Sequence, residues 1–275
     1  MPPHLLSSPQ RGEETKIPSP QRGEGKGEGA IMNSQIVEED LYGRVCFDYF
    51  KGEMKGKAYL VRDDGYRDPF DVGNYFGTAD AFAPVEKKLL EFAKSSKVLD
   101  VGCGPGRFAL YLQQKGWDVT AIDNSPYIVN IAKERNVKNV ILGSVEDVNL
   151  PKTVFDTILL FGNNIGIAGT IDEARKFLNK LFSLTAKRGR ILLTSLNINR
   201  TKEKHHLIYQ QANREQGKYI GEIKLRMEYD GKIGPWFPWL LIESETLTAI
   251  AKSCGWKTVG LLDEYLYGMV LEKED

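Results

Sequence analysis

The sequence predicts an α/β fold, a doubly wound and mostly parallel seven-stranded sheet with an antiparallel C-terminal hairpin and a small cap. Two patterns indicate it: from Pro84 onward short apolar runs alternate with amphipathic helical segments, and a glycine-rich loop joins the first run to the helix after it. The 275 residues are 41% hydrophobic and 27% charged, as in an ordinary globular protein. Buried apolar strands that alternate with helices are typical of a parallel sheet covered on both faces.

Helical spacing and apolar runs predict the elements of the core in order. Pro84 suits the first turn of a helix, and Val85, Leu89 and Phe92 follow it at helical spacing. A turn at Lys187-Arg188-Gly189 precedes the last core strand. The other predicted elements are strands at 97–101, 119–122, 139–142, 155–161 and 190–195, and helices at 108–115, 126–135 and 171–181.

Two segments stand outside this alternation. An aromatic stretch precedes Pro84, and a later insertion holds a predicted strand at 222–229 with the hairpin signal Asp230-Gly231. A helix at 246–253 and strands at 257–263 and 265–271 then resume the pattern. We therefore expect a disordered tail (1–34), a first cap segment (35–83), the core (84–196), a cap insertion (197–242) and a C-terminal helix and hairpin that complete the core (243–275).

The first thirty residues have low complexity. The string SPQRGE occurs at 8–13 and again at 19–24, and few apolar side chains accompany it. Such a segment buries too little to offset chain entropy, so we expect disorder, and it lacks the apolar run of a signal peptide. A regulatory tail is one interpretation. The one we prefer is that Met32 is the start of translation, so that residues 1–31 are not part of the native protein.

Charge and composition argue against several classes of protein. Thirty-seven basic and thirty-seven acidic residues give a formal net charge of zero, so neither nucleic acid nor a membrane surface is the expected partner. No run is long and apolar enough to span a bilayer. Three cysteines without a CxxC pair and three histidines predict no metal site and a reducing, cytoplasmic location. The oligomeric state stays open.

The sharpest local pattern is the glycine loop in VLDVGCGPGRF. Its glycines are Gly102, Gly104 and Gly106, and Asp100 stands two residues before the first. The G-x-G-x-G spacing differs from the G-x-G-x-x-G of dinucleotide-binding loops. A backbone loop beside a carboxylate suits a ligand that carries an ammonium group better than it suits a pyrophosphate.

This run resembles motif I of the class I, Rossmann-like S-adenosylmethionine-dependent methyltransferases, and later motifs follow in order across about residues 84–196. The resemblance implies S-adenosylmethionine as cofactor, held in part by Cys103 backbone and the loop glycines. VTAIDNS resembles the second strand, which implies that Asp123 and Asn124 hold the ribose; one carboxylate can accept from two vicinal hydroxyls.

Two further motifs complete the resemblance. LGSVED resembles the segment beside the adenine, which implies contacts from Val145 and Glu146; Ser144 stands where many relatives have Asp, so the adenine amino contact would pass to Glu146 or Asp147. The run from Phe155 to Asn163 resembles the fourth strand, which implies that Phe161 lies near the methionine moiety.

Each of these side chains also has a purely structural interpretation. Asp100 and Gly102 could simply cap and turn the chain, as in any doubly wound protein. Asp123 does not decide the cofactor by itself, because nicotinamide enzymes also place an acid at this position. Cys103 is more typical of a small packing residue than of a nucleophile. Phe161 fits the core as well as a ligand wall, and His205 with His206 fits a solvated polar pair as well as a base. The Trp236–Trp239 cluster either supports the cap or lines the acceptor pocket.

The resemblance implies in-line transfer of a methyl group to an O or N nucleophile, which requires no fixed catalytic motif. An Asn/Asp-Pro-Pro-aromatic run and a Pro-Cys nucleophile are both absent, which argues against amino-directed and cytosine-C5 enzymes; a small-molecule acceptor is the best remaining interpretation. The candidate acceptor-side residues are Tyr75, Asn163, His205 and Trp236. Two alternatives stay open: a non-catalytic S-adenosylmethionine- or S-adenosylhomocysteine-binding protein, and a nicotinamide-dependent oxidoreductase.

Overall fold

The computed structural model describes residues 40–94 and 96–274, and within them the chain forms a seven-stranded sheet with the order β11-β12-β7-β6-β3-β4-β5. This confirms the predicted α/β class, because β3 to β7 run parallel and β11 and β12 form an antiparallel hairpin beside β7. The expected tail and the Met32 start lie outside the described residues. The strands are β3 (Lys97–Val101), β4 (Asp118–Asp123), β5 (Val140–Leu142), β6 (Phe155–Leu160), β7 (Thr185–Leu196), β11 (Trp256–Leu262) and β12 (Leu266–Lys273).

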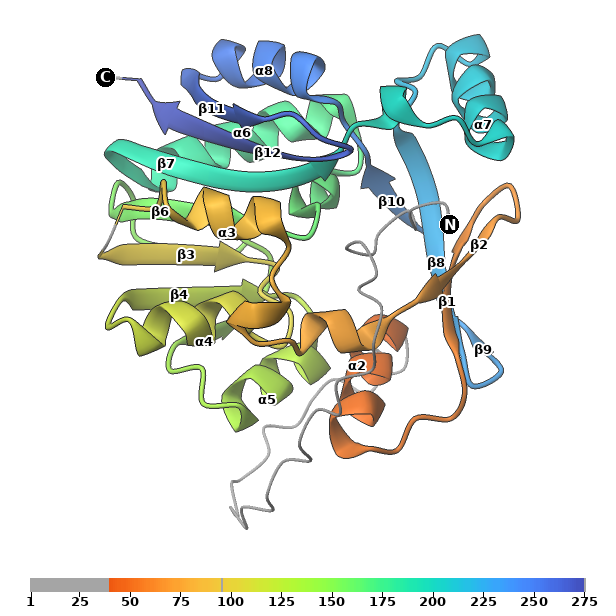
Figure 1. Ribbon diagram of the computed structural model, residues 1–275, viewed down its shortest axis with the longest axis horizontal. Coiled ribbons are helices and arrows are strands. Elements are labelled where there is room, and N and C mark those ends of the chain that lie inside the picture. Colours follow the sequence, from red (N-terminus) through yellow and green to blue (C-terminus); the bar gives the residue numbers. More distant parts are fainter. Residues whose placement is uncertain (1–39, 95, 275) are drawn as a thin grey trace.

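Helices cover both faces of this sheet (Figure 1). Leu89 of α3 and Phe108 of α4 belong to one buried cluster, whereas Leu178 of α6 and Leu247 of α8 belong to another, on the opposite face. These apolar positions repeat at helical spacing, which is why the segments form amphipathic helices. The bounds are α3 (Pro84–Leu90), α4 (Arg107–Gln114), α5 (Pro126–Glu134), α6 (Ile171–Leu184) and α8 (Ser244–Ser253).

A second, smaller sheet of β10-β8-β1-β2, with β9 paired to β8, lies beside the carboxyl ends of the core strands (Figure 1). It joins segments far apart in the sequence, because β1 pairs with β8 in an antiparallel register that places Leu60 opposite Met227. We call this sheet with helix α2 the cap. Its elements are α2 (Leu41–Lys51), β1 (Ala58–Arg62), β2 (Arg67–Phe70), β8 (Glu222–Tyr229), β9 (Lys232–Ile233) and β10 (Phe237–Leu240).

The cap packs on the core through helix α5. Ile128 and Ile131 of α5 share a buried cluster with Leu41 and Val45 of α2. Ser125 caps α5 by accepting a hydrogen bond from the Ile128 amide at 3.1 Å, and Pro126 follows at the first helical position. The sequence therefore fixes the start of α5, and α5 in turn fixes where α2 sits.

The structure differs from the sequence-based expectation in two places. Strand β7 begins at Thr185, so the turn expected at 187–189 lies inside the strand. The strand is irregular there, because Arg188 has a positive φ of 57°. The pairing with β6 also shifts register, between Phe155 and Thr157. Helix α7 (Lys204–Glu215) was not predicted. A local irregularity in a strand resembles a turn in sequence, since both contain glycine and residues in the left-handed region.

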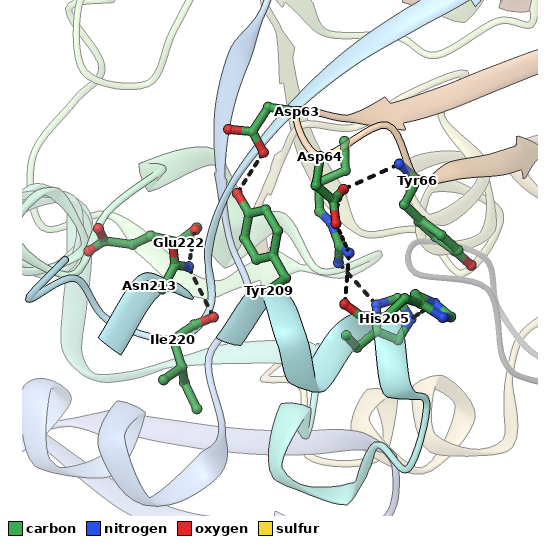
Figure 2. A network of polar contacts seen from close by, with 10 residues as sticks. Asp63, Asp64, Tyr66, His205, Tyr209, Asn213, Ile220 and Glu222 are labelled. Atoms are coloured by element: carbon green, nitrogen blue, oxygen red, sulfur yellow. Dashed lines mark hydrogen bonds and ion pairs between the residues drawn. The ribbon is translucent and has the colours of Figure 1, made fainter. Parts of the chain in front are cut away.

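Helix α7 escaped prediction because its buried face is polar. His206, Gln210 and Asn213 are buried at helical spacing, with exposed fractions of 7%, 7% and 4%. Gln210 donates to the carbonyl of Ile198 at 3.0 Å. Asn213 donates to the carbonyl of Glu222 at 2.7 Å (Figure 2). Hydrogen bonds to backbone carbonyls replace the apolar contacts that periodicity analysis looks for.

A buried arginine ties α7 to the cap sheet. Arg62 at the end of β1 is 2% exposed and donates to both carboxylate oxygens of Asp64, at 2.8 and 2.7 Å (Figure 2). Its Nη1 lies 3.0 Å from Nδ1 of His206, and Tyr66 stacks on His205 with ring centroids 4.4 Å apart. The bidentate pair with Asp64 stabilises the buried positive charge of Arg62 between the cap sheet and α7.

In the described parts of the chain, every helix is too short or too polar to cross a bilayer.

The buried histidine predicts a pH-dependent stability. Burial, then His205 and Arg62, lower the pKa of His206 from 6.5 to about 4. Between these values the unfolded chain binds the proton and the folded chain does not, so the contribution of His206 to the free energy of unfolding is present above pH 6.5 and is lost as the pH falls toward 4. In the variant His206→Gln, this part of the loss of unfolding free energy at low pH should be absent.

Urea unfolding of both proteins at a series of pH values checks the expectation. Other groups titrate in the same window, so the informative quantity is the difference between wild type and variant. A difference that stays constant with pH would contradict the assignment.

Candidate functional site

A cavity of about 450 Å³ lies between the carboxyl ends of the core strands and the inner face of the cap. Its core side is formed by loops after β3, β4, β5 and β6, and its cap side by α2, β1, β2, β8 and β10. In doubly wound folds, ligands bind at this end of the sheet. The residues used below that line it are Asp40, Tyr42, Leu60, Phe70, Tyr75, Gly102, Asp123, Asn124, Ser125, Ser144, Val145, Asn164, Met227, Phe237, Pro238 and Trp239.

The glycine loop bends sharply where β3 meets α4. Gly102, Gly104 and Gly106 have positive φ values of 67°, 53° and 85°. A Cβ on Gly102 would lie 2.6 Å from the Asn164 amide nitrogen, so a side chain has no room there. The Gly102 amide donates to the carbonyl of Ile122 at 2.9 Å. The chain makes the predicted tight turn, and Gly102 lines the cavity.

Asp123 ends strand β4 and lines the cavity. Its carboxylate accepts from the amides of Gly104 and Ser125, both at 3.0 Å. Burial raises its pKa to about 6, and the two amide donors act in the opposite direction. The Asp123 carboxylate therefore connects the second predicted motif, VTAIDNS, to the glycine loop of the first.

Asp100 lies beneath the loop and is 2% exposed. Its Oδ2 atom is buried without a hydrogen-bond partner, and burial raises its pKa to about 7. An unsatisfied buried carboxylate oxygen is costly, and a ligand cation or donor would relieve that cost. The ammonium group of the ligand expected at motif I could donate to this oxygen.

Two adjacent asparagines after β6 face opposite ways. Asn163 adopts a left-handed φ of 65°, and its Oδ1 accepts from the Ser195 hydroxyl at 2.6 Å inside the protein, away from the cavity lining. Asn164 lines the cavity and donates to the carbonyls of Val101 and Gly102, at 2.7 and 2.8 Å. Asn164 was not among the sequence candidates. The Asn-Asn pair after the fourth strand could have indicated that Asn164, as well as Asn163, was a candidate.

The segment after β5 contributes Ser144 and Val145 to the lining, and Asn124 contributes after β4. Glu146 is exposed and is not part of the lining; its carbonyl accepts from Lys180 at 3.1 Å. Ser144 is the polar side chain that this segment presents to the cavity, at the position where the resemblance called for Asp.

The cap side of the cavity is aromatic. Tyr42 and Tyr75 meet edge to face with centroids 6.1 Å apart, and Phe70 packs against Tyr75 at 5.3 Å. Burial raises the pKa of both tyrosines, so each hydroxyl stays protonated. Within the Trp236–Trp239 cluster, Trp239 lines the cavity, whereas Trp236 is 45% exposed on the far face, over the Arg226 guanidinium.

Phe161, Cys103 and His205 are sequence candidates that lie outside the lining, as do Asp100, Gly104 and Gly106 of the glycine-loop motif. Phe161 packs against Phe108 in the core with centroids 4.7 Å apart. Cys103 is buried and donates to the carbonyl of Gly104, and burial raises the pKa of its thiol, so it is not poised as a nucleophile. His205 stands on α7 against Tyr66. Across the described residues, no group of three or more His, Cys, Asp or Glu side chains is arranged to hold a metal ion.

Residues 98–189 match a family model described as a methyltransferase domain. A crystal structure of a SAM-dependent methyltransferase from Bacteroides fragilis, in complex with S-adenosyl-L-homocysteine, matches with a TM-score of 0.74 and 29% identity over 87% of this chain and 97% of that chain. The chain contains a class I S-adenosylmethionine-dependent methyltransferase domain. The cofactor of such a domain is S-adenosylmethionine, as predicted.

Curated relatives of this methyltransferase domain are diverse. A ubiquinone biosynthesis O-methyltransferase from Schizosaccharomyces pombe is 30% identical over 37% of this chain and 38% of its own length. A 23S rRNA (uracil(747)-C(5))-methyltransferase from Pyrococcus abyssi is 28% identical over 56% of this chain and 34% of its own. The chain thus spans roughly a third of the length of these relatives, and their names differ in the acceptor.

Asp123→Ala should weaken binding of S-adenosylhomocysteine by about 1.5–3 kcal/mol without unfolding the domain, because it removes a charge-assisted acceptor. Calorimetric titration measures the loss. Asp118→Ala, at the exposed opposite end of β4, is the matched control. Unchanged affinity in Asp123→Ala would contradict the placement of the ribose at this carboxylate.

Asn164→Ala should weaken the same binding by about 0.5–1.5 kcal/mol per lost hydrogen bond, because the glycine loop loses its tie to the loop after β6. Asn163→Ala is the comparison, since its side chain bonds Ser195 in the interior. We expect that variant to lower the melting temperature with little effect on affinity. Equal affinity losses in both would argue against a separate role for Asn164.

Proposed function

We propose that the protein transfers a methyl group from S-adenosylmethionine to a small-molecule acceptor, at an O or N nucleophile, by in-line displacement. The observation that carries the proposal is a cavity in which the loops of the methyltransferase domain meet an aromatic wall from the cap. Such an arrangement binds both reactants side by side and excludes water, and positioning supplies much of the rate of methyl transfer.

The cofactor would be held by residues from each predicted motif. Asp100 and the backbone of Gly102, Cys103, Gly104 and Gly106 would meet the methionine moiety, Asp123 and Asn124 the ribose, and Val145 the adenine. The orphaned Oδ2 of Asp100 and the crowded Gly102 support this set. Glu146 is exposed and Phe161 packs on Phe108 in the core, so these two have less support. Asn164 and Ser144 line the cavity and take their place in the proposal.

A small acceptor is favoured over nucleic acid by the charge of the site. Among the described residues that line the cavity there is no Lys, Arg or His, and the whole chain has no net charge. A protein that binds RNA or DNA needs a basic surface to contact the phosphates. The rRNA methyltransferases among the relatives therefore do not serve as the guide to this acceptor.

On the acceptor side we place Tyr75 with Tyr42, Phe70 and Trp239 rather than Asn163, His205 or Trp236, because the former line the cavity. With no histidine in the lining, positioning rather than a strong base would carry the reaction. A cytoplasmic location belongs to the same proposal, supported by three free, buried cysteines.

The test is calorimetric titration of the purified chain with S-adenosylmethionine, S-adenosylhomocysteine and NADH, followed by an assay for S-adenosylhomocysteine release with pooled small molecules. We expect micromolar binding of the first two, none of NADH, and release in at least one pool. Binding without release in any pool would favour the non-catalytic binding protein. NADH binding alone would favour an oxidoreductase and overturn the proposal.

A further inference from the structure

The cap wall of the cavity is apolar and aromatic, and this composition limits the acceptor. Leu60 of β1 and Met227 of β8 lie opposite each other in the sheet, and Phe70, Phe237 and Trp239 extend the same surface. An acceptor that buries itself against this wall has to present an apolar, preferably flat, body. The following inference rests on the proposed function and asks which nucleophile that body carries.

The charged groups facing the cavity are all negative. Among the described residues of the lining, Asp40 and Asp123 are the charged ones. Neighbouring arginines are engaged elsewhere: Arg107 pairs with Glu86 at 2.7 Å, Arg135 donates to the carbonyl of Pro105 at 2.7 Å, and Arg226 pairs with Glu228 at 2.6 Å. An anionic acceptor would meet two carboxylates without a compensating cation, so the site selects against carboxylates and phosphates.

In the described part of the chain, the lining has no histidine to act as a base, and its two carboxylates are already engaged. Asp123 is assigned to the ribose in the proposed function, and Asp40 accepts from the Gly43 amide and the Ser125 hydroxyl. The tyrosine hydroxyls stay protonated because burial raises the pKa of Tyr42 and of Tyr75. A hydroxyl acceptor must lose its proton as it attacks, whereas a neutral amine attacks with a lone pair it already has.

We propose that the acceptor is an uncharged amine on an apolar or aromatic body, and that the aromatic cap wall and the two carboxylates stabilise the positive charge that its nitrogen acquires. The nitrogen lone pair forms the N–CH₃ bond as the sulfur–methyl bond breaks, with that electron pair passing to sulfur. The positive charge moves from sulfur to nitrogen and stays in the cavity. The ammonium product loses its extra proton to water after release.

The wall suits that charge. Aromatic faces attract cations, and the attraction grows when the cation is desolvated, as it would be in a cavity lined by Tyr42, Tyr75 and Trp239. The carboxylates of Asp40 and Asp123, which line the same cavity, would add a negative field. An alcohol or thiolate acceptor gains nothing from this field, because its product carries no positive charge.

The experiment uses the full chain with three acceptor pools matched in size: apolar amines, the corresponding alcohols and phenols, and the corresponding carboxylates. Release of S-adenosylhomocysteine and the mass of the methylated product are measured between about pH 7 and about pH 9, where the neutral fraction of an amine rises. We expect product in the amine pool, with a rate that rises with pH. Faster product formation from alcohols, phenols or acids overturns the inference.

Absence of product in every pool, with S-adenosylhomocysteine binding intact, overturns both the inference and the catalytic function on which it rests. Product from alcohols, phenols or acids without product from amines overturns the inference and leaves the proposed function standing, so the two failures are distinguishable.

A binding measurement tests the charge argument without turnover. With S-adenosylhomocysteine present at about pH 7, protonated 2-phenylethylamine, which carries the charge of the ammonium product, should bind at least about tenfold more tightly than 3-phenylpropionate, which has a similar body and opposite charge. Met227→Lys should remove this preference, whereas Met227→Gln, which alters polarity without charge, should keep most of it. If Met227→Lys does not fold, Phe237→Lys against Phe237→Gln gives the same comparison. Equal affinities for the amine and the carboxylate in the wild type overturn the inference.

Discussion

The site depends on the pairing of strand β1 with strand β8. This ladder joins a segment that precedes the methyltransferase core to one inserted after its fifth strand, and places Leu60 beside Met227 on the cavity wall. Without it, the two aromatic segments would be separate hairpins, each too small to be stable in water. With it, they form one surface that faces the carboxyl ends of the core strands and encloses the space where the reactants would meet.

The core side of the cavity is held by a few hydrogen bonds between loops. Asp123 accepts from Gly104, and Asn164 donates to Val101 and Gly102, so three strand-end loops share one network. The positive φ angles of the glycines make this approach possible, because side chains would fill the space between the loops. The network leaves Asp100 with an unsatisfied oxygen beside the glycine loop, where a ligand donor would relieve the cost.

The methyltransferase core was predictable because its signals are local. Apolar runs, helical spacing and the glycine loop each occupy a few consecutive residues, and the predicted sheet and cofactor agree with the structure and the comparisons. Helix α7 was not predicted, since His206, Gln210 and Asn213 fill its buried face with polar groups whose partners lie elsewhere in the chain. Asn163 and Asn164 could not be told apart, because only the left-handed backbone at Asn163 turns one inward and the other toward the loop.

The two-part cap also has a consequence for biosynthesis. Strand β1 leaves the ribosome long before β8 is made, and at about 5–20 residues per second the delay is roughly ten to thirty seconds. During that time the β1–β2 hairpin has an unpaired edge and its apolar face has no partner, a state prone to association with other chains. Because the cap is built from two distant parts of the chain, its assembly is therefore favoured by rapid translation, or by chaperones that shield this hairpin until β8 is made.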